Sequence, residues 1–383
     1  MANLTLTSSN ADLVAGFAWA KAQALAYVYR GDAVGDWYEA ALPGREAFCM
    51  RDVAHQSTGA QLLGLADCNY NMLRRFAENI SASKDWCTYW EINRYNQPCP
   101  ADYQSDTHFW YNLPANFDLL HCYYRQYLWT GDRRYIDDPT FRFFYDKSVD
   151  EYVVRWDRDG DGIPDHLPSD GIRGIGTYNE VVPHPRVGGD LIAAQYGAYL
   201  AYASIQELRG EWPVAERFQA KAQALQQLYY NTWWDEAAGR FASFRLQDGT
   251  LHAGYHGVPN FFPLYFNLVP AGEHRDCALA DVLQNAGPNV EERAYLPELF
   301  YQYGQHEAAF AQLTAQLAPT YERREYPEVS FCAIGNMGVG LLGISPDATT
   351  RTVTTQPRLT AAVDWVELAH VPVFDTLLTI RHQ

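Results

Sequence analysis

Residues 157–189 read DRDGDGIPDHLPSDGIRGIGTYNEVVPHPRVGG, and this polar, glycine-rich run separates two segments with the apolar periodicity of helices. The first segment ends near Trp156, and Asp190 is placed to cap the second. A connection of about thirty residues inside a compact domain is unusual, and such loops are generally functional. The rest of the chain is therefore predicted to be a helical scaffold that presents such loops on one rim.

Working outward from this loop, the spacing of apolar residues predicts five helices before it and seven after it. Short and long connections alternate, which is typical of helical hairpins. Six hairpins closed into a ring give a mainly α fold, an (α/α)6 toroid, while a helical bundle or solenoid is the alternative. The expected helices are 9–29, 50–65, 67–79, 114–130, 139–156, 190–208, 213–234, 259–267, 274–285, 290–303, 305–318 and 332–344, with a β-hairpin at 240–257.

The C-terminal segment has a different pattern. Apolar and polar residues alternate in 351–359, 365–373 and 376–382, which are rich in Thr and Val and are predicted to be strands. About 35 residues are too few for an independent sheet. We therefore expect a helical domain, residues 1–348, and a small β appendage packed on it, residues 349–383.

The composition limits the possible partners. The chain has 383 residues, a formal net charge of −17 at pH 7 and 15% aromatic residues. The charge argues against nucleic acid and anionic membranes, and is neutral about small uncharged substrates. Aromatic faces serve in sugar sites, although an aromatic-rich core explains the same content. The seven cysteines form no CxxC pair and no metal-ligand spacing, so we expect them to be reduced and structural.

The N-terminal segment bears on localisation. Residues 1–20 lack the basic start of a signal peptide, and the apolar stretch 13–29 is broken by Lys21 and Gln23. We therefore expect a cytoplasmic protein without a membrane span, although a chain whose leader had been removed would look the same.

Three loops between expected helices carry clustered polar residues: 43–56, 157–189 and 321–330. Hydrolysis of a glycosidic bond is one reaction that such loops would support. It requires a carboxylic acid near the leaving oxygen and a carboxylate that activates water or attacks carbon. A solvated loop residue or a helix cap is the alternative for each acid. The candidates are Asp170, Glu180, Glu325 and Glu328.

One acid of each loop fits a catalytic role better than the other. Glu180 precedes the apolar run 181–183, so desolvation would raise its pKa as a general acid requires, whereas Asp170 has a more solvated setting. Glu328 is close to the start of the last helix, whose partial positive charge would keep a general base ionised. Glu325 follows two arginines with which it can pair.

Arg51 and Asp52 stand side by side at the entrance of the second expected helix. Together they can clamp sugar hydroxyls, with Asp52 accepting and Arg51 donating hydrogen bonds, while a capping Asp beside an Arg is the alternative. His55 and Gln56 would extend this polar rim. The other expected substrate-binding residues are Trp110, Tyr178 and His184.

This layout resembles the six-hairpin glycosidases, the (α/α)6-barrel families that include glucoamylases, trehalases, processing α-glucosidases and bacterial α-rhamnosidases. In glucoamylases an Arg-Asp pair after the first helix holds the non-reducing sugar, and Arg51-Asp52 in MRDVAHQ matches it. Their general acid lies between helices five and six and their general base between eleven and twelve. The run VEERAYLPELFYQYG, residues 290–304, is similar to a tract of the superfamily, and the segments after residue 349 resemble the β tail of some of its barrels.

The resemblance implies an exo-acting, inverting glycoside hydrolase that removes a terminal sugar from an oligosaccharide or glycoconjugate. The expected partner is a small carbohydrate, with no nucleic acid or membrane. Two other classes remain open. A polysaccharide lyase on a related toroid would need a cation-rich cleft, and a non-catalytic carbohydrate-binding protein need not keep carboxylates facing one another.

No cofactor is expected, with one alternative. The run DRDGDG at 157–162 resembles the front of a calcium loop, but position twelve is Pro168 instead of a bidentate Glu, which excludes an EF-hand. The choice is between a looser Ca²⁺ site and a tight turn whose aspartates cap backbone amides. The residues in question are Asp157, Asp159, Asp161 and Asp165.

Overall fold

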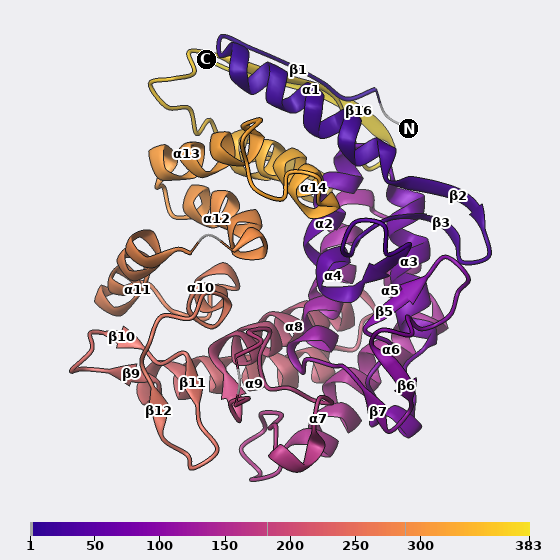
Figure 1. Ribbon diagram of the computed structural model, residues 1–383, viewed down its shortest axis with the longest axis vertical. Helices are drawn as coiled ribbons and strands as arrows, with labels where there is room; N and C mark the ends of the chain where they lie inside the picture. Colours follow the sequence, from indigo (N-terminus) through magenta and orange to yellow (C-terminus); the bar gives the residue numbers. More distant parts are fainter. Residues whose placement is uncertain (1–2, 182, 288) are drawn as a thin grey trace.

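The computed structural model of the protein describes residues 3–181, 183–287 and 289–383. The structure is mainly helical with several small sheets, and Figure 1 shows the helices following one another around a common centre. None of the described helices combines the length and apolar content needed to cross a bilayer.

Six helices contact one another in succession: α2 packs on α4, α4 on α8, α8 on α10, α10 on α12 and α12 on α14, which returns to α2. These inner helices are strongly buried. All nine residues of α14 are buried, whereas only five of the 21 residues of α9 are. The bounds of the inner helices are α2 Met50–Leu62, α4 Pro114–Thr130, α8 Gly189–Leu208, α10 Val258–Tyr265, α12 Val290–Gln302 and α14 Pro327–Gly335.

The outer helices pack against this inner set: α1 on α14, α3 on α2, α9 on α8, α11 on α10 and α13 on α12. The helices lie close to the expected ranges, with two differences. The predicted fifth helix is divided at Asp150, and the predicted twelfth begins at Pro327 and continues as the π-helical segment η3. The bounds are α1 Ala11–Ala26, α3 Ala66–Glu78, α5 Arg134–Asp137, α6 Pro139–Val149, α7 Glu151–Trp156, α9 Trp212–Thr232, α11 Glu273–Asn285, α13 His306–Leu317, η1 Ala82–Lys84, η2 Pro168–Asp170 and η3 Asn336–Leu341.

A glycine allows α2 and α14 to approach closely. A Cβ atom on Gly59 of α2 would lie 1.9 Å from the backbone oxygen of Phe331 in α14. No side chain fits in that space, so the residue is determined by the contact between the two helices.

The ends of the chain meet in one sheet. The predicted C-terminal strands are confirmed as β14, β15 and β16, and β15 also pairs with β1, which places Thr5 opposite Ala369 (Figure 1). The four-residue β1 was not expected. The predicted hairpin is confirmed as β11 and β12, and β11 also pairs with β8. The strands are β1 Thr5–Ser8, β2 Val28–Asp32, β3 Gly35–Tyr38, β4 Ala47–Cys49, β5 Glu91–Asn93, β6 Tyr103–Ser105, β7 His108–Phe109, β8 Val187–Gly188, β9 Trp234–Asp235, β10 Arg240–Phe241, β11 Phe244–Arg245, β12 Leu251–His252, β13 Ser345–Asp347, β14 Thr352–Thr354, β15 Val366–Val373 and β16 Thr376–His382.

Candidate active site

A cavity of about 360 Å³ is lined by the starts of α2, α12 and α14 and by the long loops before α4 and α8. A second cavity of about 610 Å³ shares Glu180 and Glu291 with it. We call them the inner cavity and the outer cavity. The inner cavity joins residues from all three polar loops of the sequence, and its acids are Asp52, Glu91, Asp102, Glu180, Glu291 and Glu328.

The guanidinium group of Arg51, at the start of α2, lies beside two aromatic rings that contact each other. Its guanidinium carbon is 5.7 Å from the ring centroid of Trp90 and 5.5 Å from that of Tyr178. Its Nη2 donates a 2.6 Å hydrogen bond to Glu291 Oε1, whereas its Nε is 4.0 Å from Asp52 Oδ1. The ion-pair partner of Arg51 is therefore a residue of α12, and Asp52 keeps acceptor capacity for another group.

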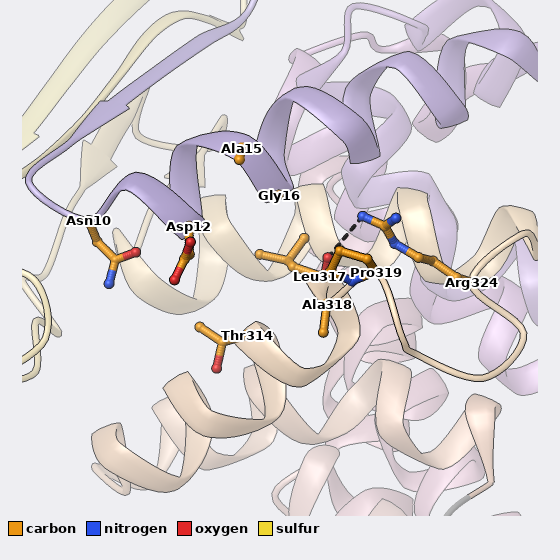
Figure 2. Close-up of a pocket in the computed structure, with 9 residues that line it drawn as sticks. All are labelled: Asn10, Asp12, Ala15, Gly16, Thr314, Leu317, Ala318, Pro319 and Arg324. Carbon is orange, nitrogen blue, oxygen red and sulfur yellow. Dashed lines mark hydrogen bonds between the residues drawn. The ribbon is translucent and has the colours of Figure 1, made fainter.

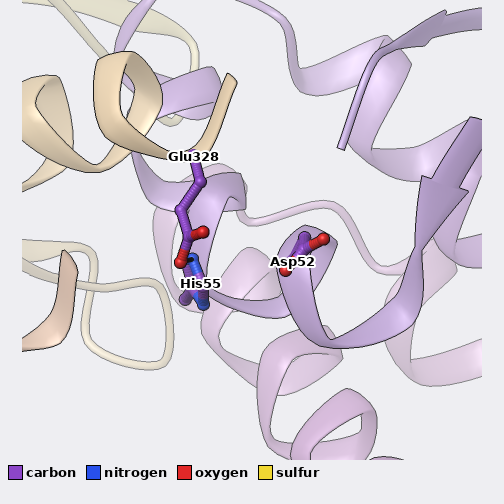
Figure 3. Close-up of side chains that lie close together, drawn as sticks. All are labelled: Asp52, His55 and Glu328. Carbon is purple, nitrogen blue, oxygen red and sulfur yellow. Dashed lines mark ion pairs between the residues drawn. The ribbon is translucent and has the colours of Figure 1, made fainter. Parts of the chain in front are cut away.

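Glu328, in the first turn of α14, is buried beside His55 and Asp52 (Figure 3). His55 Nε2 lies 3.0 Å from Glu328 Oε1, without the alignment of a hydrogen bond. Burial and the charge of Glu291 raise the pKa of Glu328 to about 8, and burial lowers the pKa of His55 to about 3, so this histidine is neutral. The expectation that the helix start keeps Glu328 ionised was wrong, because burial and the charge of Glu291 favour the protonated carboxyl.

Burial also raises the pKa of Asp52 well above its usual value, and the charge of Glu328 adds to the effect. The two carboxyl groups lie within 4.8 Å of each other. Like charges at this separation disfavour simultaneous ionisation, so the pair tends to hold a proton.

Glu180 lines both cavities and is exposed. The predicted desolvation of its carboxyl is therefore wrong. The prediction was based on the apolar run 181–183, of which Val182 lies outside the described residues. The preceding residues are nevertheless fixed, because the buried Asp190 accepts hydrogen bonds from Tyr178 N at 2.5 Å and from Thr177 Oγ1 at 2.9 Å. Asn179 Nδ2 also donates to His256 O at 2.6 Å.

The second candidate of each loop lies away from the inner cavity. Asp170 accepts hydrogen bonds from Leu167 N at 2.9 Å and from Arg158 at 3.1 Å, so it holds its own loop together. Glu325 is exposed, and its backbone oxygen accepts a hydrogen bond from Tyr27. In the part of the chain that the structure describes, neither acid lines the inner or the outer cavity.

The remaining expected binding residues have different surroundings. Trp110 lines the inner cavity, and the ring of His184 packs edge-on against it. Tyr178 lines the outer cavity and donates from its hydroxyl to Asp118 Oδ2 at 3.2 Å. Gln56 was expected on the rim but is fully buried one turn below it.

The six acids of the inner cavity fall into two groups, those with an arginine partner and those without one. Arg45 pairs with Glu91 at 3.0 Å and with Asp102 at 3.1 Å. Arg51 pairs with Glu291 and approaches Asp52, as described above. Glu180 and Glu328 are the two acids of the inner cavity for which the described residues provide no Arg or Lys partner.

Glu91 and Glu291 were not predicted as site residues. Glu291 belongs to the VEERAYLPELF tract, whose likeness to a superfamily sequence was noticed without a role for the acid. Its place after Asn289, whose side chain caps Glu291 N at 2.8 Å, was the available signal that it begins a helix. Glu91 stands in an aromatic loop and follows Trp90, but nothing local distinguishes it from a solvated acid.

Two arginines pair with the acidic turn at 157–165. Arg186 pairs with Asp159 at 2.7 Å and with Asp165 at 2.8 Å, and Arg245 pairs with Asp161 at 2.9 Å. Asp157, which completes a group of three possible metal ligands there, accepts hydrogen bonds from the backbone of Gly160 and Gly162. The turn therefore has the capping aspartates of the tight-turn alternative together with two guanidinium groups. The other groups of possible metal ligands are Asp52, His55 and Glu328, and Glu91, Cys99 and Asp102.

A third cavity of about 510 Å³ lies between α1 and α13 (Figure 2). Arg324 on its wall donates to Leu317 O at 2.9 Å, and Asp12 is the acid of its described lining. One acid does not provide the pair that glycoside hydrolysis requires, so the inner cavity is the candidate active site.

A family model described as the mannosylglycerate hydrolase MGH1-like glycoside hydrolase domain matches residues 188–292, which include α8 and α10 and end one residue after the Glu291 of the site. The match covers part of the chain. The chain also has the fold of several solved structures. No curated protein sequence matches it.

Among these structures is one described as a sialidase, with 13% identity, a TM-score of 0.69, and coverage of 99% of this chain and 38% of its own. The GH78 family rhamnosidase of Bacillus sp. GL1 shows 13% identity and a TM-score of 0.67, covering 97% and 39%. A wild-type glycosidase shows 12% identity and a TM-score of 0.59, covering 85% and 96%. The chain thus spans less than half of the sialidase and of this rhamnosidase, and the likeness is one of fold.

Proposed function

We propose that the chain hydrolyses the terminal glycosidic bond of an oligosaccharide or glycoconjugate, with Glu180 and Glu328 as the catalytic pair. The observation that carries the proposal is the division of the acids in the inner cavity. Four acids lie beside Arg45 or Arg51, while Glu180 and Glu328 face the same cavity without such a partner. An acid that has no ion-pair partner can exchange a proton with a substrate without breaking an ion pair.

Position supports Glu180 as the general acid. The leaving oxygen joins the terminal sugar to the rest of the substrate, and Glu180 lines both cavities, where this bond would lie. Glu328 lines the inner cavity alone and is buried, which suits a base that activates water on the far side of the sugar. Geometry takes precedence over the pKa of the free protein in such an assignment. The pKa of Glu328, about 8, then becomes a testable property of the base.

The size of the two cavities supports exo-action. Small-molecule sites have volumes of roughly 300–1,000 Å³, and the inner cavity of about 360 Å³ suits one terminal sugar. The outer cavity of about 610 Å³ would take the part of the substrate that leaves. We also propose inversion of configuration, which requires carboxyl groups roughly 6.5–9.5 Å apart with a water between them. NMR of the first anomer released would test this.

The proposed scaffold is an (α/α)6 toroid over residues 1–348 with a β appendage at 349–383. The closed succession of contacts from α2 through α14 supports the inner ring, and the outer helices pack on it one by one. The strand β1 joins the C-terminal sheet, so the appendage would be attached to the toroid through both ends of the chain.

The pair is tested with Glu180→Gln and Glu328→Gln. Each should reduce turnover by a factor on the order of a hundred or more with folding retained. An activated aryl glycoside needs little protonation of its leaving group, so it should partly rescue Glu180→Gln and not Glu328→Gln. Glu325→Gln, on the same loop as Glu328, serves as the matched control and should keep its activity. Full activity in either test variant would remove that residue from the mechanism.

The pH dependence separates the two roles. If Glu328 is the base, it acts only when ionised. In Glu180→Gln acting on the activated aryl glycoside, where no proton donor is needed, kcat/KM should therefore rise with pH until about 8. A kcat/KM of this variant that instead falls as the pH passes about 8 would make Glu328 the proton donor and exchange the two assignments.

A further inference from the structure

We propose that the inner cavity accepts an uncharged sugar and rejects acidic sugars such as uronates and sialic acids. This inference rests on the proposed function, because it concerns the terminal sugar that the inner cavity would hold. The argument depends on the charged groups of the described lining, which are two arginines and six acids.

Arg45 is already committed to two acids. Its Nη2 donates a 3.1 Å hydrogen bond to Asp102 Oδ2, and its Nε lies 3.0 Å from Glu91 Oε2. Glu91 is 7% exposed, and burial together with the charge of Asp102 raises its pKa to about 8, so Asp102 is the charged partner of Arg45 at pH 7. A sugar carboxylate that bound Arg45 would displace one of these acids and leave it close to the incoming charge.

Arg51 is committed in the same way. Its guanidinium lies beside the rings of Trp90 and Tyr178, and Glu291 holds it through a 2.6 Å ion pair. Because Glu291 itself lines the inner cavity, its carboxylate would remain there after displacement. Arg51 can still donate to neutral hydroxyls, which bring no competing charge.

Glu180, which has no arginine partner, opposes an anion directly. Glu328 also lines the cavity, and its protonated carboxyl supplies no positive charge. Sugar hydroxyls both donate and accept, so they match a lining rich in carboxyl oxygens, whereas placing like charges together is costly. The nearby Arg323 is exposed and belongs to the lining of the outer cavity. A cation there would serve the leaving part of the substrate.

The test measures binding, with matched monosaccharides and isothermal titration of the intact chain at pH 7. The pairs are glucose with glucuronate, mannose with mannuronate and galactose with galacturonate, and N-acetylneuraminate is added as a sialic acid. At least one neutral hexose should bind, and its uronate should bind at least about tenfold more weakly, which corresponds to about 1.4 kcal/mol. Raising the salt concentration should narrow this gap, because screening weakens the repulsion.

A double variant tests the role of the committed arginine. Glu91→Gln with Asp102→Asn leaves Arg45 without its carboxylates, so the ratio of uronate to hexose affinity should rise by about tenfold. Asp137→Asn removes the exposed ion pair of Arg133 and should leave the ratio unchanged. Thermal unfolding of the double variant checks that it folds. If it does not, Asp102→Asn alone, which halves the acidic partners of Arg45, should raise the ratio by a smaller factor.

Two results would overturn the inference. A uronate or N-acetylneuraminate that binds the wild-type protein as tightly as the neutral hexoses would overturn it while leaving the catalytic pair intact. An unchanged ratio in the folded variants would show that the arginine pairing does not set the charge preference. The proposed function fails by a different result, namely the absence of both sugar binding and hydrolysis.

Discussion

Removing the charge of Glu328 should stabilise the protein at alkaline pH while abolishing its activity. Glu328 is 6% exposed, and burial together with the charge of Glu291 raises its pKa to about 8. In the unfolded chain a glutamate titrates near 4.3. Between these two values the folded protein holds a proton that the unfolded chain has released. The free energy of unfolding therefore decreases as the pH rises through this range, and the decrease ends above the folded pKa.

One such group contributes a slope of up to about 1.4 kcal/mol per pH unit. Asp52 and Glu291 lie close to Glu328, so the titrations of the three acids influence one another. We therefore expect Glu328 alone to contribute roughly half of the full slope. Between pH 5 and pH 8 the wild-type protein should thus lose about 2 kcal/mol more of its free energy of unfolding than Glu328→Gln loses. Urea unfolding at four pH values, followed by the fluorescence of the 11 tryptophans, measures this difference.

Glu325→Gln is the control, because Glu325 is exposed on the same loop and should leave the pH slope as it is in the wild type. Equal slopes for the wild type and Glu328→Gln would refute the account of a buried, protonated carboxyl. A gain in stability together with a loss of turnover would instead mark Glu328 as an acid kept for function at the expense of stability.

Three further outcomes are expected. Gly59→Ala should lower the free energy of unfolding by about 1–3 kcal/mol in urea titrations, because its Cβ would overlap the backbone of Phe331; an unchanged midpoint would contradict this contact. Asp190→Asn should leave a buried donor without an acceptor, cost about 1–3 kcal/mol, and reduce turnover because the loop that carries Glu180 loses its anchor; normal turnover would show that the loop is held by other contacts. Added Ca²⁺ should not change the midpoint of thermal unfolding, since arginines such as Arg245 pair with the acidic turn at 157–165, and a clear rise would reveal a cation site there.

Periodicity was sufficient to predict most helices, because each inner helix buries most of its residues and each outer helix buries one face. It also located the loops that line the inner cavity. The strand β1 could not be predicted, since four residues carry little pattern and their partner β15 lies at the other end of the chain. The break at Asp150 likewise depends on how α6 and α7 pack, and the helical pattern continues through it.

The site was predicted by residue type more than by environment. Arg51 and Asp52 were recognised as a pair, yet the ion-pair partner of Arg51 is Glu291, which is far away in sequence. The desolvation predicted for Glu180 was wrong because its side chain is exposed, and the ionised state predicted for Glu328 is disfavoured by its burial. Whether a carboxyl group is exposed or buried depends on the residues that pack against it, and these can be distant in the sequence. The local sequence therefore does not predict it.

The contact between α2 and α14 also has a consequence for biosynthesis. Asp52 and Glu328 share one cavity, but at translation rates of about 5–20 residues per second they leave the ribosome roughly 15–55 s apart. Until the last inner helix emerges, the apolar faces of α2 and α12 that it covers have no partner. A nascent chain would then expose these apolar faces, to which a chaperone could bind. A translational pause at this stage would favour aggregation. The packing of α14 both covers these apolar faces and brings Glu328 to Asp52. The candidate site should therefore form at the same step that removes the exposed apolar surface.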